Sequence, residues 1–263
     1  MEHNPFDIKI KDRIATVIFN RPEKHNAINY EGWLKLLEEV KTLSQNKNVR
    51  AVVFSGSGGK SFSAGADIKD FEENRKDSHT AMTYSEAFDG ALDAIESMPF
   101  PTISKINGIC VGGGCELAMA TDIRIASNES KFGIPVAKLG ILIGYREMKR
   151  LINLVGSGNA SYILLSGRIF GASEALQMGL VNQVVSEKEL DTVVSDLVSE
   201  IVPLAPLSQE RHKKILSSTI KNPSLTNLTK EEAFLPFSNF DSDDFKEGQL
   251  AFVKHKTPDF KGH

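Results

Sequence analysis

Three consecutive glycines followed closely by a glutamate form the segment of this sequence whose residue types are best suited to chemistry. Gly112, Gly113 and Gly114 follow a predicted strand and open a predicted helix, and Glu116 lies in the first turn of that helix. The first N–H groups of a helix lack partners within it and are partly positive, and glycine lets a ligand come close to the main chain. The N–H groups at this helix start are therefore candidates for an oxyanion hole. The alternative explanation of the glycines is close packing of the helix.

The neighbours of Glu116 are small or apolar: Cys115, Leu117, Ala118, Met119 and Ala120. A carboxyl among them is partly desolvated, which raises its pKa towards the range of a general acid or base. The alternative is an acidic residue that merely complements the helix dipole. A second loop of small residues, 63–67, offers the Ala66 N–H as a further donor.

Other motifs fail on spacing. The glycine triplet does not fit the Gly-x-Gly-x-x-Gly dinucleotide fingerprint. Residues 55–61 resemble a P-loop, but Phe54 stands where its first glycine is needed, so a surface turn is predicted. No serine has Gly-x-Ser-x-Gly flanks, and Cys110 and Cys115 are predicted to be small buried hydrophobes. No metal site is predicted from the spacing of the histidines, which are His3, His25, His79, His212, His255 and His263.

Apolar patterning predicts an α/β chain. A helix is expected over 30–46 with Asn29 as N-cap, and another over 80–97. Strands are expected over 14–19, 51–54, 101–106, 122–127 and 181–185. Residues 1–190 are predicted to form the α/β core, and residues 191–263 a helical C-terminal region punctuated by prolines.

Composition excludes several classes of protein. The 263 residues are 41% hydrophobic and 25% charged, as in ordinary globular chains. A net charge of -3 provides no basic field for nucleic acid or an anionic membrane. With two cysteines, no apolar leader and no apolar run of about 18 residues, we expect a cytoplasmic protein.

Three ordered motifs together resemble the crotonase superfamily, the enoyl-CoA hydratase/isomerase family. They are Asn-Arg-Pro-Glu-Lys-His-Asn-Ala at 20–27, Phe-Ser-Ala-Gly-Ala-Asp-Ile-Lys at 62–69, and the segment 107–118 around the glycine triplet. The likeness continues through 121–124, 132–133, 179–181 and 247–248. It implies a spiral core of ββα turns and a helical C-terminal region that helps trimers form, two of which often stack as a hexamer.

The resemblance also implies a coenzyme A thioester as substrate and no prosthetic group. The family's two oxyanion N–H groups fall on Ala66 and Gly113. Its CoA-binding positions fall on Lys24, Ala27, Ala64, Asp67, Ile68 and Lys69. A basic residue from an adjacent subunit often joins the phosphates, and His255 stands at that position between Lys254 and Lys256.

One position departs from the pattern of the hydratases. They use two glutamates, of which the first matches Glu116 and the second falls on Val136, which cannot move a proton. The small glycine-rich turn that usually follows is Gly144-Tyr145-Arg146-Glu147, so Tyr145 and Glu147 either bring polar groups to the pocket or lie on the surface. The family's geometry implies a substrate pocket lined by Phe71, Tyr84, Val136, Leu139, Leu142, Gly144 and Tyr145.

Several functions therefore remain open. Glu116 alone can activate water for addition to an enoyl thioester, which is the favoured reading, or shuttle a proton in double-bond isomerisation. Decarboxylation of a malonyl-type thioester needs only the stabilised enolate. The other class is a non-catalytic CoA-binding or scaffold protein. Some relatives bind RNA through a lysine-rich helix, but the helix 30–46 mixes Glu31, Glu38 and Glu39 with Lys35 and Lys41, which argues against it.

Overall fold

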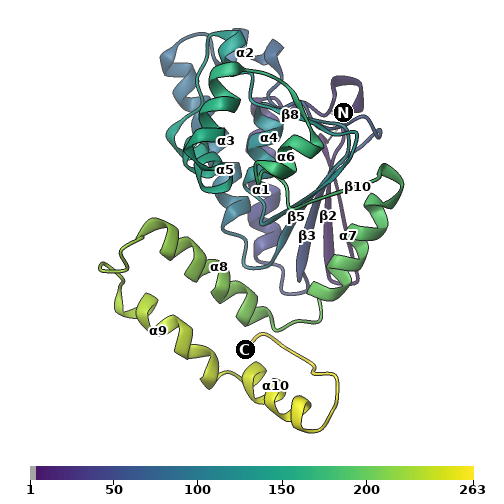
Figure 1. The fold of residues 1–263 in the computed structure, drawn as a ribbon, viewed down its shortest axis with the longest axis vertical. Coiled ribbons are helices and arrows are strands. Elements are labelled where there is room, and N and C mark those ends of the chain that lie inside the picture. The colour runs from purple at the N-terminus through teal and green to yellow at the C-terminus, as the bar shows by residue number, and fades with distance from the viewer. Residues whose placement is uncertain (1–3) are drawn as a thin grey trace.

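The computed structural model describes residues 4–263 and contains two β-sheets (Figure 1). Helices pack against the larger sheet. Its strand order is β1-β2-β3-β5-β7-β10, and all neighbours are parallel except the antiparallel pair β1 and β2. The strands are β1 (Phe6–Lys11), β2 (Ile14–Phe19), β3 (Ala51–Gly56), β5 (Thr102–Ile106), β7 (Ile123–Ser127) and β10 (Gln183–Val185). The strands predicted near 14–19, 51–54, 101–106 and 122–127 are confirmed, and the last one begins later than predicted, at Gln183.

A second sheet is made of strands of two or three residues, β4 (Ser61–Ser63), β6 (Ile109–Val111), β8 (Lys131–Gly133) and β9 (Phe170–Gly171). Strands β4, β6 and β8 run parallel, and each follows a strand of the large sheet within a few residues. A helical segment then follows each pair, which is the predicted spiral of ββα turns. The segment 55–61 is the end of β3, a turn and the start of β4, as predicted against a P-loop.

Two hydrophobic layers cover the large sheet on opposite sides (Figure 1). On one side lie α1 (Tyr30–Ser44), α2 (Phe71–Asn74), α3 (Ser78–Glu96), α4 (Gly113–Met119), α5 (Tyr145–Ser166) and α6 (Ala172–Gln177). Helix α1 buries Trp33, Leu36 and Val40 at helical spacing, and the Asn29 side chain caps it by accepting from the Gly32 N–H at 3.1 Å, as predicted. On the other side α7 (Glu187–Ile201) packs on the sheet.

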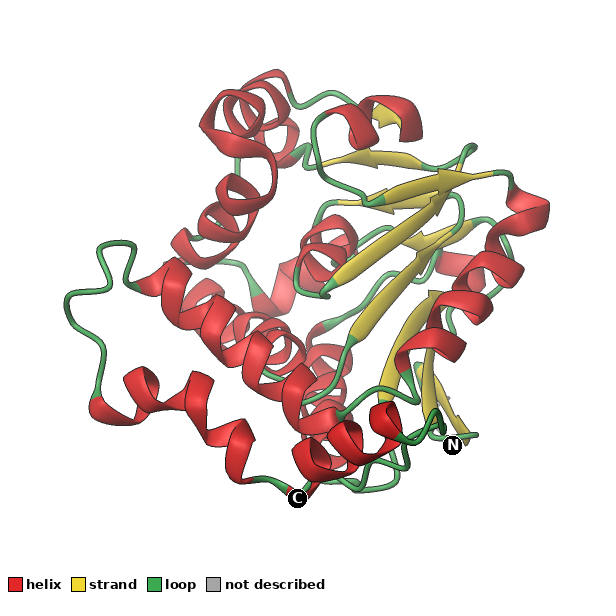
Figure 2. Cartoon of the chain, turned by 60° about the horizontal axis from the view of Figure 1, so that its bottom comes forward, coloured by secondary structure: helices red, strands yellow, loops and turns green. Residues whose placement is uncertain are grey.

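The remaining helices form a layer of their own below the α/β part of the chain (Figures 1 and 2). They are α8 (Pro206–Lys221), α9 (Lys230–Ser238) and α10 (Asp243–Val253). The predicted boundary at residue 190 falls inside α7, whose Leu190 and Val194 belong to the sheet's second core, and the division into two parts stays a prediction. Among residues 4–263, none of the helices has the length and apolar character needed to cross a bilayer.

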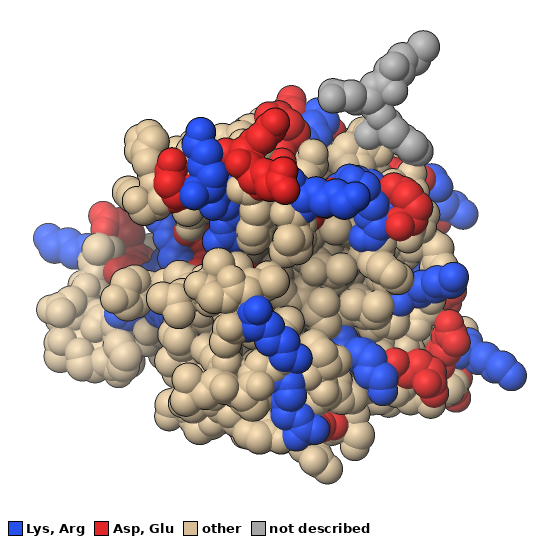
Figure 3. Space-filling view, turned by 90° about the horizontal axis from the view of Figure 1, so that it is seen from above, with Lys and Arg blue, Asp and Glu red and all other residues tan. Residues whose placement is uncertain are grey.

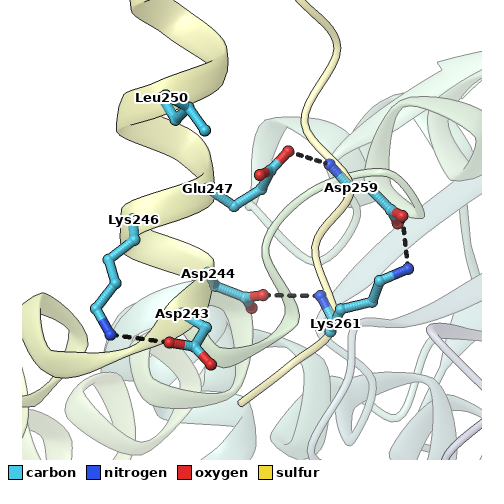
Figure 4. Close-up of a pocket in the computed structure, with 7 residues that line it drawn as sticks. All are labelled: Asp243, Asp244, Lys246, Glu247, Leu250, Asp259 and Lys261. Carbon is cyan, nitrogen blue, oxygen red and sulfur yellow. Dashed lines mark hydrogen bonds and ion pairs between the residues drawn. The ribbon is translucent and has the colours of Figure 1, made fainter.

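The C-terminal tail turns back along α10 and is held there by backbone N–H groups (Figure 4). The Asp244 carboxylate accepts from the Lys261 N–H at 2.8 Å and the Gly262 N–H at 3.0 Å, and Glu247 accepts from the Asp259 N–H at 3.0 Å. Arg50, next to β3, donates to the Phe260 carbonyl at 3.2 Å. The tail therefore links the helical layer to the α/β part of the chain.

Replacing Asp244 by alanine is expected to release this tail. Asp244 is 4% exposed, so its loss leaves two N–H groups without their acceptor, at a cost of about 1–3 kcal/mol. Limited proteolysis should cleave faster after Lys254 and Lys256. The matched control is Asp243→Ala next to it, because within residues 4–263 the Asp243 side chain bonds only to the exposed Lys246. Equal cleavage of the two variants would contradict the anchoring role.

Candidate active site

Two backbone N–H groups from distant parts of the chain lie side by side at the start of α4. Gly113 is the first residue of α4, so its N–H has no partner inside the helix. The Ile28 N–H donates to the Gly65 carbonyl and the Asp67 N–H to the Ile28 carbonyl, which leaves the Ala66 N–H outside this ladder. A Cβ placed on Gly113 would be 3.4 Å from the Ala66 nitrogen. The structure thus brings together the two predicted donors.

This approach requires bare backbone on both sides. Gly65 has a φ of +89°, and a Cβ there would lie 2.5 Å from the Gly113 nitrogen. A Cβ on Gly114 would lie 2.2 Å from the Ser63 carbonyl oxygen. Close packing, one of the two explanations of the glycine triplet, is therefore confirmed, and the oxyanion hole stays a prediction.

Buried polar contacts hold the loop that carries Ala66. Asn26 is 1% exposed, and its side-chain amide donates to the Ser61 carbonyl at 2.8 Å, while the Ser63 hydroxyl donates to the Asn26 carbonyl at 2.9 Å. The sequence reading assigned no role to Asn26. Its part in a recognisable motif at 20–27 was the available signal.

Asp67 is buried and pairs with two cations, Arg21 at 3.0 Å and Lys24 at 3.1 Å. Burial acts to raise the pKa of Asp67, but the hydrogen bonds from Lys24 and Arg21 outweigh it and hold the pKa below its ordinary value. The carboxylate therefore stays ionised and fixes both basic side chains beside the loop.

The other predicted CoA-binding residues differ in accessibility. Ile68 and Lys69 are exposed, and the side chain of Lys24 is 44% exposed. Ala27 is buried and Ala64 half-buried, and their N–H groups donate to Lys24 and His25 carbonyls. An accessible rim thus runs beside the two N–H donors, and its binding role stays a prediction.

Glu116 is only 6% exposed, among the apolar residues of α4. Burial, together with the charge of Glu147, raises the pKa of Glu116 to about 8, and Arg75 acts in the opposite direction. Arg75 stacks over the rings of Phe71 and Tyr84, at 4.6 Å and 4.9 Å from their centroids. The predicted desolvated carboxyl is present, with a basic side chain near it that the sequence reading missed.

Glu147 lies in the first turn of α5 and is 3% exposed, so the surface alternative for this residue is wrong. Burial, together with the carboxyl of Asp89 on α3, raises the pKa of Glu147 to about 7. Tyr145, two residues before it, does lie on the surface and is 96% exposed. The only signal in the sequence that Glu147 is paired was Arg150, three residues later on the same helix. This spacing does not show whether the face that carries both residues is buried or exposed.

The predicted substrate-pocket residues range from buried to fully accessible. Val136 and Phe71 are half-buried, whereas Leu139 is 54% and Leu142 87% exposed. Tyr84 is 2% exposed and accepts from the Trp33 indole N–H at 2.8 Å, which makes it part of the core. Gly144 is the N-cap residue of α5. The substrate-contacting role of the exposed residues stays a prediction.

Among residues 4–263, no group of three or more His, Cys, Asp or Glu side chains could hold a metal ion, and His3 lies outside the described residues. Cys110 and Cys115 are buried free thiols, as predicted. On the face seen in Figure 3, basic and acidic side chains are intermixed around an uncharged central area.

A family model described as enoyl-CoA hydratase/isomerase matches residues 9–263. The chain belongs to the enoyl-CoA hydratase/isomerase family. A short-chain-enoyl-CoA hydratase of Clostridium acetobutylicum is 34% identical over 263 residues, 99% of each chain. A crotonyl-CoA hydratase of Syntrophomonas wolfei is 33% identical over 260 residues, again 99% of each.

The fold agrees with this family. The crystal structure of an enoyl-CoA hydratase/carnithine racemase from Magnetospirillum magneticum superimposes with a TM-score of 0.95 at 34% identity, covering 100% of this chain and 97% of the other. The crotonase fold predicted from the three motifs is therefore confirmed, and the relatives support hydratase-type acyl-CoA activity.

Substituting Gly65 by alanine is expected to separate the two N–H donors. The new Cβ meets the Gly113 nitrogen at 2.5 Å, so overpacking of about 1–3 kcal/mol adds to the penalty of a positive φ. The matched control is Gly59→Ala, which has a φ of +68° with nothing within 4 Å. Thermal denaturation should show a clearly larger fall in Tm for Gly65→Ala, and equal falls would contradict the close approach.

Replacing Glu116 by glutamine is expected to stabilise the protein at high pH. Because the folded-state pKa of about 8 lies above the unfolded value, the folded chain holds this proton more tightly, and that contribution is lost as pH rises through 8. The Tm of Glu116→Gln minus that of the unsubstituted protein should therefore grow between pH 5 and pH 9, by the equivalent of roughly a few kcal/mol. The exposed Glu129→Gln is the control, and a difference independent of pH would show that Glu116 is not desolvated.

Proposed function

We propose that the protein adds water across the α,β double bond of an enoyl-CoA thioester, and catalyses the reverse elimination. The observation that carries the proposal is the close approach of the Ala66 N–H, in the loop after β4, to the Gly113 N–H, on the helix that also bears the buried Glu116. The hydratase names of the relatives support the same reaction class.

The two N–H groups would bind the thioester oxygen, on which negative charge develops as water attacks. Donors already in place stabilise that charge without reorganising, and each is worth about 10²–10³ in rate. Glu116 takes a proton from water as the oxygen bonds to the β-carbon, and the α-carbon of the enolate receives another. A carboxyl whose pKa is about 8 exchanges protons readily near neutral pH in both directions.

Coenzyme A would lie along the accessible rim of the loop. We assign its adenine end to the main chain of Ala66 to Lys69 and its phosphates to Lys24, with Ala27 and Ala64 shaping the backbone and Asp67 orienting Lys24. The acyl group would extend past Glu116 towards Val136, Leu139, Gly144 and Tyr145.

We further propose a homotrimer, alone or stacked as a hexamer. The α8–α10 layer exposes large apolar side chains, and a partner chain would cover them: Leu216, Phe234, Phe237, Phe240, Leu250, Phe252 and Val253. The exposed Leu142 and Tyr145 would then face the neighbouring subunit, whose His255 would reach the CoA phosphates.

The valine at position 136 also fits reactions that need only one acid/base group. With no carboxyl at that position, double-bond isomerisation by Glu116 alone or decarboxylation of a malonyl-type thioester fits the same oxyanion pair. Mass spectrometry of a panel of acyl-CoAs separates these reactions. A gain of water marks a hydratase, a loss of carbon dioxide marks a decarboxylase, and a shifted double bond at constant mass marks an isomerase.

Glu116→Gln is expected to lower kcat for hydration of crotonyl-CoA by about 10²–10⁴-fold with little change in KM, because the amide keeps the shape and cannot take a proton. The measurement is loss of the enoyl thioester absorbance. Glu129→Gln, on an exposed turn, should keep the original kcat. A Glu116→Gln variant with the original rate would overturn the assignment of Glu116.

A further inference from the structure

A second buried carboxyl, Glu147, is close enough to Glu116 for its charge to raise the pKa of Glu116, and it lies on a different element from the one where the family pattern places the second glutamate. Helix α5 packs against both α4, which bears Glu116, and the turn Val136–Leu139, where the family's second glutamate is missing. The first turn of α5 turns Glu147 inwards, 3% exposed, while Tyr145 points to solvent.

We propose that Glu147 is the second acid/base group of the site, supplying the carboxyl that Val136 lacks, and that it shares one proton with Asp89. This inference rests on the proposed hydratase function and names the group that delivers the α-carbon proton.

Unpartnered oxygens support the shared proton. Glu147 Oε1 and Asp89 Oδ1 are both buried, and neither has a hydrogen-bond donor within residues 4–263. Asp89 and Glu147 act on one another as hydrogen-bond partners, which two ionised carboxylates cannot be. A single proton held between them satisfies both oxygens, as in other buried carboxyl pairs.

Among residues 4–263, the cation that forms an ion pair with Glu147 is Arg150, and it makes no hydrogen bond to it. Arg150 Nη1 lies 3.9 Å from Glu147 Oε1, too far for a hydrogen bond, and has no partner itself. The other guanidinium nitrogens of Arg150 pair with Asp93 and Glu96 on α3. The Arg150 charge is thus drawn away from Glu147, which remains able to hold a proton.

The groups that set the protonation of this cluster come from four segments. Glu116 on α4, Asp89 on α3, and Glu147 with Arg150 on α5 act on one another, and Arg75 after α2 faces Glu116. The pKa values of about 8 for Glu116 and about 7 for Glu147 indicate that the pair loses its protons in two steps close to neutrality. Between these steps Glu116 and Glu147 share one proton, and the reaction uses the form with this proton on Glu147 and with Glu116 ionised, which is the less populated form because Glu116 has the higher pKa.

The protons of the reaction then balance between Glu116 and Glu147. As the water oxygen bonds to the β-carbon, its proton passes to the Glu116 carboxylate, and the π electrons move onto the thioester oxygen. The enolate collapses, and its α-carbon takes the proton from Glu147. One proton is received and one delivered, so the pair keeps its total, and exchange with solvent or between the carboxyls restores the starting state.

The test compares kcat, KM and the pH profile of crotonyl-CoA hydration for the full-length protein, Glu147→Gln and Asp93→Asn. Asp93→Asn is the matched control, because it weakens the same contact between α3 and α5 at its exposed end without touching either carboxyl of the pair. The unsubstituted protein should show a bell-shaped dependence of kcat/KM on pH, with maximum activity between the two steps. Melting temperatures confirm that each variant is folded.

We expect Glu147→Gln to lower kcat at least about 100-fold with KM nearly unchanged. Its residual activity should lose the fall at high pH, and the rise should move to lower pH because Glu116 no longer feels the charge of Glu147. Asp93→Asn should keep the bell and stay within about twofold of the original kcat. A folded Glu147→Gln variant with the original kcat and the original bell-shaped pH dependence would overturn this inference and leave the proposed function intact. An unsubstituted protein that hydrates no enoyl-CoA would overturn the proposed function and the inference with it.

Discussion

The close approach of two stretches of backbone, the first turn of α4 and the loop 63–66, is the constraint on which the site depends. It leaves no room for a Cβ at Gly65 or Gly114, and parallel pairing of β4 with β6 holds the two segments at that spacing. Because the donors are main-chain N–H groups, no side-chain rotamer has to be fixed for them to point together. The buried Asn26 and the Asp67 ion pairs serve the same geometry, since they fix the loop on its other side.

The same packing determines the chemistry of the carboxyl groups. An isolated ionised carboxylate is costly to bury, so the proton binds more tightly and the pKa rises. Glu116 is in that condition because α4 is enclosed on every side, and Glu147 because α5 packs against α3 and α4. Arg150 holds α5 to α3 through Asp93 and Glu96, so its charge compensates the inward-facing Glu147 only in part.

The central strands of the large sheet were predictable because they are buried on both faces and read as apolar runs, such as 51–54 in β3, whereas the strand β1 at the edge, with a half-exposed pattern, was not predicted. The small sheet was not found residue by residue, since strands of two or three residues carry no period to detect. Only the resemblance of whole motifs predicted the spiral to which these strands belong. The layer of α8–α10 was predicted as helical, but nothing in its sequence showed how it lies against the rest of the chain.

The sequence by itself determined the family, the glycines that permit a bare oxyanion pair, and a glutamate held among apolar neighbours. These features are local, because each depends on residues adjacent along the chain. The tertiary structure decided which carboxyls share the site with Glu116. Tyr145 and Glu147 stand two residues apart on one helix turn, yet one is exposed and the other buried. Their sequence could not distinguish them, because the burial of Glu147 depends on Asp89 and α4, which approach it only when the chain is folded.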